Sequence, residues 1–84
     1  IEMVPGDVAT KITETVSIPT VGIGAGNGCD AQVLVWQDMA GLRDSQLPRF
    51  VKQYADMRKV MSDAAQAFAK DVESGSFPGP EHTF

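Results

Sequence analysis

The stretch that decides the fold is two β-type runs joined by a glycine-rich loop, Ile18-Pro19-Thr20-Val21-Gly22-Ile23-Gly24-Ala25-Gly26-Asn27-Gly28-Cys29-Asp30-Ala31-Gln32-Val33-Leu34-Val35-Trp36-Gln37-Asp38. Residues 20–24 predict a short strand, and residues 31–36 predict a second one that is almost entirely apolar. An apolar strand of this kind is typical of a parallel sheet that is covered on both faces. Asp38 is expected to close the second strand.

The flanking sequence predicts helices. Val8, Ile12 and Val16 recur at four-residue spacing and predict a helix of about three turns, with Asp7 near its start. The residue before Pro19 is pushed out of the helical region, which ends that helix. Apolar residues at helical spacing run from Leu47 to about Glu73 and predict one long helix or two in tandem, with residues 57–59 as the expected break. Residues 76–84 are expected to form an irregular tail.

Alternating strands and helices favour an α/β fold with a parallel sheet. Two or three such strands alone would leave open sheet edges and an uncovered apolar face. The chain also opens with an apolar phrase, Ile1-Glu2-Met3-Val4, rather than a polar lead. We therefore expect residues 1–84 to be the closing segment of a larger α/β protein. Its parts are a strand and helix portion over 1–45, C-terminal helices over 46–75 and a tail over 76–84.

Composition excludes several classes of protein. The formal net charge is -4, with basic and acidic residues interleaved, so no basic stripe exists for nucleic-acid binding. No apolar run approaches the ~20 residues that span a bilayer, and no signal-peptide pattern is present. Cys29 is the only cysteine, which favours a reducing, cytoplasmic location.

The glycine stretch from Gly22 to Gly28 suggests two kinds of site. A dinucleotide fingerprint needs glycines at relative positions one, three and six, followed directly by a helix. Counted from Gly22 the sixth position is Asn27, and the residues after the loop are strand-like. Glycines at the end of a barrel strand, which let a substrate approach the backbone, fit the pattern better.

Several separated motifs keep their order along the whole chain. They are Ile1-Glu2-Met3-Val4-Pro5, Ile18-Pro19-Thr20-Val21-Gly22-Ile23-Gly24-Ala25-Gly26, Cys29-Asp30, Gln32-Val33-Leu34-Val35 with Asp38, Glu73-Ser74-Gly75-Ser76-Phe77-Pro78 and Glu81-His82-Thr83-Phe84. Together they resemble the C-terminal portion of the ketopantoate hydroxymethyltransferase (3-methyl-2-oxobutanoate hydroxymethyltransferase) family. This resemblance implies the last strands and C-terminal helices of a TIM-type (βα)8 barrel, incomplete as given.

The resemblance also implies a reaction. The family transfers a hydroxymethyl group from 5,10-methylenetetrahydrofolate to 3-methyl-2-oxobutanoate, giving 2-dehydropantoate for pantothenate and coenzyme A synthesis, with Mg²⁺ bound to the oxo acid. The family's general base corresponds to Glu2, which the sequence places between a strand end and a Pro-Gly loop. The magnesium ligands correspond to nothing in these residues, so we assign no metal-ligating or cofactor-binding residue. Family members form homo-oligomers, commonly decamers.

The remaining polar candidates are expected to be structural. Asp30 should fix the loop through backbone N–H groups, and Asp38 should cap the turn that follows it. His82 has no second metal ligand nearby and is expected at the surface or in a subunit contact. Ala31 stands where the family usually has glycine, and a positive φ there would strain it by about 1 kcal/mol.

Two alternatives stay open at this point. The chain could be a non-catalytic assembly segment, from a truncated product or a split gene. It could also belong to another barrel enzyme that acts on 2-oxo acids, in the phosphoenolpyruvate mutase and isocitrate lyase group.

Overall fold

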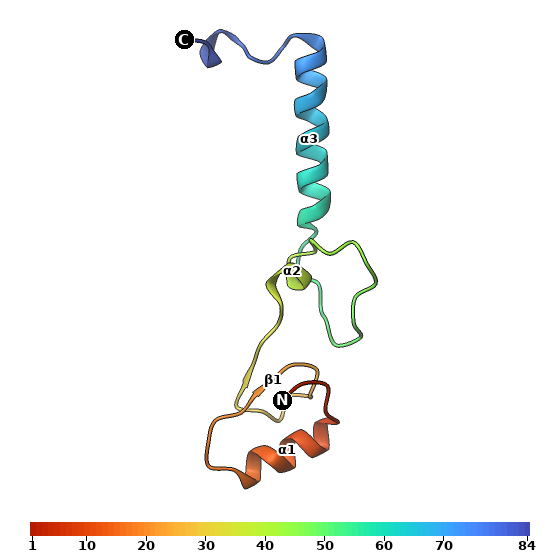
Figure 1. Cartoon of the computed structure of the whole chain (residues 1–84), viewed down its shortest axis with the longest axis vertical. Helices are drawn as coiled ribbons and strands as arrows, with labels where there is room; N and C mark the ends of the chain where they lie inside the picture. Colours follow the sequence, from red (N-terminus) through yellow and green to blue (C-terminus); the bar gives the residue numbers. More distant parts are fainter.

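The computed structural model describes residues 1–84 and has an elongated shape (Figure 1). The sheet and helix α1 lie at one end, and helix α3 extends away from them, so that the two termini are far apart. The radius of gyration is 21.4 Å, whereas a compact chain of this length is expected to have about 12 Å. The accessible surface is 6635 Å², against about 4,900 Å² for a compact protein of 9.0 kDa.

Three strand segments run parallel to one another. The named strands are β1 (Val21–Gly22) and β2 (Ala31–Gln32), which pair in the register Val21↔Ala31 and Gly22↔Gln32. On the other side of β1, Glu2 forms a parallel bridge with Ile23. The N-terminal segment therefore lies beside β1, and β1 is the middle of the three. This arrangement confirms the predicted parallel α/β pattern.

Helix α1 (Gly6–Thr15) begins after Pro5 and carries Asp7 in its first turn, as the sequence predicted. The loop over residues 24–30 connects β1 to β2 and runs along α1. It contains no helix. Ala9 and Ala25 are both fully buried there. A Cβ built on Gly28 would lie 1.9 Å from Thr10 Oγ1, so only glycine allows this approach. The loop is thus packed on α1, and β2, not a helix, follows it, which contradicts a dinucleotide fingerprint.

The second predicted strand is much shorter than expected. Strand β2 ends at Gln32, although the Val33 N–H still donates to the Gly22 carbonyl, and helix α2 (Trp36–Met39) begins where the strand was expected to continue. Asp38 therefore lies in a helix and does not close a strand. Val33 is 54% exposed, so these 84 residues leave the apolar strand face partly uncovered, as expected of two or three strands alone.

Residues 42–56, here called the arm, are not helical. Helix α3 (Met57–Ser74) begins at the expected break, and the helix predicted from Leu47 is wrong up to that point. Pro48 pushes Leu47 away from helical geometry, and the end of the arm and the start of α3 bond to the C-terminal end of α2 instead. The N–H groups of Tyr54 and Met57 donate to the Met39 and Ala40 carbonyls.

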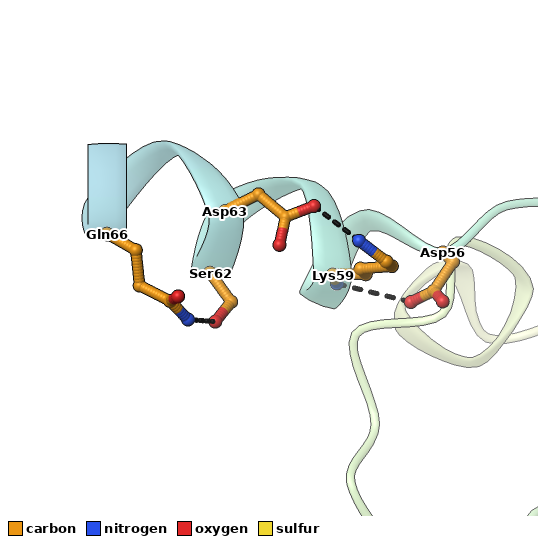
Figure 2. A network of polar contacts seen from close by, with 5 residues as sticks. All are labelled: Asp56, Lys59, Ser62, Asp63 and Gln66. Atoms are coloured by element: carbon orange, nitrogen blue, oxygen red, sulfur yellow. Dashed lines mark hydrogen bonds and ion pairs between the residues drawn. The ribbon is translucent and has the colours of Figure 1, made fainter. Parts of the chain in front are cut away.

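Helix α3 is closed at both ends by its own flanking residues. Asp56 accepts a hydrogen bond from the Lys59 N–H, and Lys59 forms an ion pair with Asp63 one turn later (Figure 2). Gly75, in the left-handed region with φ 73°, ends the helix. None of its residues is buried. The helix is therefore specified by its caps rather than by packing on the rest of the chain.

The start of the tail packs on α3 through Phe77. The Phe77 ring lies 5.4 Å from that of Phe68 and 5.1 Å from that of His82. His82 Nδ1 accepts a hydrogen bond from the Gly79 N–H within the short 3-10 helix η1 (Pro80–His82). The tail is thus ordered by aromatic contacts, where the sequence predicted only irregular structure.

Asp30 joins β1 to β2, and its removal should loosen that pairing. Its Oδ2 accepts from the Thr20 N–H at 2.8 Å and from Thr20 Oγ1 at 3.1 Å, and Thr20 is only 7% exposed. We expect Asp30→Ala to leave the Thr20 N–H unsatisfied at a cost of about 2 kcal/mol. Amide hydrogen exchange at Thr20 and Ala31 should then be about tenfold or more faster. Asp44→Ala is the matched control, because Asp44 forms only an exposed ion pair with Arg58. Equal exchange rates in both variants would contradict this role of Asp30.

Candidate functional site

The carboxyl ends of the three parallel segments border an open cleft, here called the strand-end cleft. It has a volume of about 610 Å³. Its walls come from the loop after the first segment, the glycine loop, β2 and the arm. The lining residues are Met3, Val4, Pro5, Gly24, Gly26, Gln32, Arg49 and Phe50. Ligand sites of α/β proteins lie at this end of the strands, so the cleft is the candidate site.

A second cleft of about 410 Å³ adjoins the first and is here called the arm cleft. The two clefts share Gly24, Gln32 and Phe50, so Phe50 stands between them. The lining residues of the arm cleft are Ile23, Gly24, Gln32, Val33, Leu34, Met39, Phe50, Lys52 and Tyr54. The arm therefore contributes to both clefts.

Two contacts hold the shared wall in shape. Gln32 Nε2 donates to the Gly26 carbonyl at 2.9 Å and fixes the glycine loop to β2. Gly24 has φ 64°, and a Cβ built on it would lie 2.8 Å from Cγ of Phe50. Both the backbone angle and the close approach of the ring therefore require glycine at this position.

Glu2 lies at the strand end beside the clefts but lines neither of them. Its bridge to Ile23 places the two residues on the same face of the sheet, because aligned residues of parallel strands point the same way. Glu2 is exposed. The next residue, Met3, has φ 52° and is the only non-glycine residue with a positive φ. A non-glycine residue in this region costs about 1 kcal/mol or more, and such outliers concentrate at functional sites.

The other polar candidates are not brought to the clefts. Asp30 bonds to Thr20, which confirms its role in fixing the loop through a backbone N–H. Asp38 is 8% exposed, and its Oδ1 lies 3.4 Å from Nη1 of Arg43, so it holds the turn after α2. Cys29 is a free thiol beside Gly22. Ala31 does not have a positive φ, so the strain considered from the sequence does not arise.

No group of three or more His, Cys, Asp or Glu side chains comes together in a way that could hold a metal ion. These residues alone therefore do not fit the magnesium that the resemblance implies. None of the helices is both long enough and apolar enough to cross a membrane.

Parallel strands, a helix packed on their connecting loop and a ligand-sized cleft at the strand ends define an α/β protein with its site at the carboxyl edge of the sheet. The family model described as Ketopantoate hydroxymethyltransferase matches residues 1–80. The chain belongs to this family, which decides against the phosphoenolpyruvate mutase and isocitrate lyase group.

Curated relatives carry the name 3-methyl-2-oxobutanoate hydroxymethyltransferase. The chain is 66% identical to the one from Nocardioides sp. over 83 residues, which are 99% of this chain and 28% of the relative. It is 58% identical to the one from Frankia casuarinae over 84 residues, covering 100% of this chain and 28% of the relative. It is 60% identical to the one from Streptomyces coelicolor over 83 residues, covering 99% and 28%. The chain thus spans under a third of the length of these relatives.

Arg49, Phe50 and Lys52 line the clefts but could not be identified as site residues from the sequence. Phe50 lies in the apolar pattern that predicts a helix, and only its contact with Gly24 shows that the arm folds back over the strand ends. The one available signal was Pro48, which interrupts a helix directly before these residues.

Gly24→Ala should destabilise the site by more than backbone strain alone. We expect the free energy of unfolding to fall by about 2–4 kcal/mol. About 1 kcal/mol of this comes from the positive φ, and the rest comes from the clash with Phe50. Gly75→Ala is a matched control, because Gly75 has φ 73° with nothing within 4 Å. Denaturant unfolding can be measured in a chimera that carries these 84 residues in place of the matching part of the Nocardioides relative. Equal losses in the two variants would show that Phe50 does not pack on Gly24.

Proposed function

We propose that these residues are the C-terminal part of a 3-methyl-2-oxobutanoate hydroxymethyltransferase and contain its general base, Glu2. The observation that carries the proposal is a glutamate at the carboxyl end of a parallel strand in a chain of this family. The proposed location is the cytoplasm.

We propose further that the three strand segments are the last strands of a (βα)8 barrel. In support, the two outer segments have no further strand partner, and apolar side chains such as Val21 and Val33 are 46% and 54% exposed. A barrel would pair both edges and cover this face. Barrel active sites lie at the carboxyl ends of the strands, where Glu2 and the strand-end cleft are found.

In the proposed reaction, the Glu2 carboxylate removes the proton from C3 of 3-methyl-2-oxobutanoate. The resulting enolate carbon forms a bond to the methylene carbon of 5,10-methylenetetrahydrofolate. Both carbon–nitrogen bonds of that methylene group break, and water supplies the hydroxyl group. The proton held by Glu2 and one proton of the water go to the two folate nitrogens, so the products are 2-dehydropantoate and tetrahydrofolate. The protein must hold the base within hydrogen-bond reach of the C3 proton. The magnesium that the resemblance implies would need ligands from outside these residues.

The backbone around Glu2 supports this role. The Met3 N–H donates to the Ile23 carbonyl at 3.0 Å, and the Ile23 N–H donates to the Ile1 carbonyl at 2.9 Å, so the residues on both sides of Glu2 are bonded to β1. The left-handed turn at Met3 then directs the chain away from the strand. Glu2 is therefore held on a paired strand rather than on a loose loop, as a base requires for a fixed geometry.

Exchange of deuterium into C3 of 3-methyl-2-oxobutanoate tests the role of Glu2 without folate. In the Nocardioides chimera with Mg²⁺, Glu2→Gln should lower the exchange rate by about 10²-fold or more, because general-base catalysis contributes 10²–10⁴-fold. Glu14→Gln, an exposed change on α1, should leave the rate unchanged. Exchange by Glu2→Gln at the rate of the unchanged chimera would refute the assignment of the base.

The isolated 84-residue chain should be inactive. A barrel of this type has about 250 residues, and only 6 of the 84 residues are buried in this chain. We expect no exchange above background from the purified chain, and exchange after addition of the upstream part of the relative. Exchange by the isolated chain would contradict this expectation.

We also propose that α3 contributes to contacts between subunits of a homo-oligomer, a decamer by resemblance. In support, its large apolar side chains are exposed, including Val60, Met61 and Phe68 at 59%, 60% and 56%. A helix with such a stripe normally packs on another surface.

A further inference from the structure

The connection from Glu2 to α1 consists of three residues, Met3, Val4 and Pro5, and it is fixed at its strand end. The Met3 N–H donates to the Ile23 carbonyl at 3.0 Å, directly after the bridge between Glu2 and Ile23. The chain bends at Met3 itself. The connection therefore leaves the paired strand within one residue of the proposed base.

The connection is also fixed at its helix end. The Pro5 carbonyl accepts a hydrogen bond from the Ala9 N–H at 2.9 Å, in the first turn of α1. Gly6, the first residue of the helix, lies against the glycine loop, because a Cβ built on Gly26 would be only 2.9 Å from the Gly6 Cα. The start of α1 therefore cannot shift to suit another path of the connection without losing this packing.

Only one of the three residues is free to make the change of direction. The ring of Pro5 holds its φ at -51°. Val4 precedes a proline, which keeps its backbone extended. The change of direction therefore falls on Met3, whose φ of 52° makes it the one non-glycine residue in the left-handed region. Gly, Asn and Asp adopt this region most readily, and β-branched residues are the least compatible with it.

We propose that Met3 is a positioning residue for the general base, and that its left-handed backbone, rather than its side chain, determines where the Glu2 carboxylate lies. This inference rests on the proposed function, because it assumes that Glu2 removes the C3 proton. Since the helix end is fixed, any other φ at Met3 has to be accommodated on the strand side, where it displaces Glu2 from its pairing with β1. A displacement of about 1 Å from the reacting geometry can lower the rate of a chemical step by about 10²-fold.

The backbone and the side chain of residue 3 predict opposite orders of activity, since Met3 also lines the strand-end cleft. Met3→Asn and Met3→Gly keep the left-handed conformation accessible but remove the apolar side chain. Met3→Ile keeps an apolar side chain of similar size, but it is β-branched and disfavours that conformation. If the backbone positions Glu2, the first two variants remain active and the third does not.

Deuterium exchange into C3 of 3-methyl-2-oxobutanoate in the Nocardioides chimera separates the two explanations. At saturating oxo acid, Met3→Ile should lower the exchange rate about tenfold or more and leave the KM for the oxo acid within about threefold, because it misplaces the base and not the substrate. Met3→Asn and Met3→Gly should exchange within about threefold of the unchanged chimera. Protection of the residue 3 amide against hydrogen exchange should fall in Met3→Ile and be kept in Met3→Asn, which reports the bond to the Ile23 carbonyl independently of turnover.

Met57→Ile is the matched control, because it makes the same side-chain change at the exposed first residue of α3, where φ is not positive. It should leave the exchange rate and the KM unchanged. The reverse order, with Met3→Ile active and Met3→Asn and Met3→Gly impaired, would overturn the proposal, as would equal rates in all three variants. A rise in KM that accounts for the whole loss in Met3→Ile would overturn it as well. If Met3→Ile does not fold, the other two variants still decide, because a side-chain role predicts that both are impaired.

The result for Glu2→Gln separates this inference from the proposed function. If Glu2→Gln exchanges deuterium at the unchanged rate, the proposed function fails, and the protection of the residue 3 amide still decides whether this conformation holds Glu2 on β1. If Glu2→Gln is impaired and the Met3 variants follow the reverse order, only the positioning role fails.

Discussion

The structure depends on the pairing of β1 with its two parallel neighbours. Backbone hydrogen bonds and the N-terminal amine hold the three segments together, and Asp30 with Thr20 joins β1 to β2 at their amino-terminal ends. Parallel strands make few local contacts, so this small sheet has only the glycine loop and α1 to cover it. The proposed position of the general base follows from the fact that all three segments end on the same side.

Much of this arrangement could be predicted from the sequence. The four-residue spacing of Val8, Ile12 and Val16 gave α1, and the two β-type runs around the glycine loop gave the parallel pair. These features can be predicted because each of them depends on residues close together in the sequence: a Pro-Gly turn, an amphipathic stripe and a loop aspartate. Asp30 could be assigned for the same reason.

The arm and the clefts could not be predicted, because they depend on contacts between residues far apart in the sequence. The apolar residues Leu47, Phe50, Val51 and Tyr54 have helical spacing, but Phe50 packs on Gly24 and the Tyr54 N–H bonds to Met39. These tertiary contacts outweigh local periodicity. The length of β2 was overestimated for a related reason, since an apolar run is equally compatible with a strand and with the helix that begins at Trp36.

The capping of α3 has a consequence for the proposed subunit contact. With Asp56 at one end and Gly75 at the other, and with the Phe77 ring folded against Phe68, the helix is ordered by its own neighbours. At 18 residues it is about 27 Å long and is presented as a rigid rod. Binding of this helix to another surface does not have to offset the conformational entropy that a flexible segment would lose on folding. Less of the free energy gained by burying its apolar residues is then offset by ordering of the backbone.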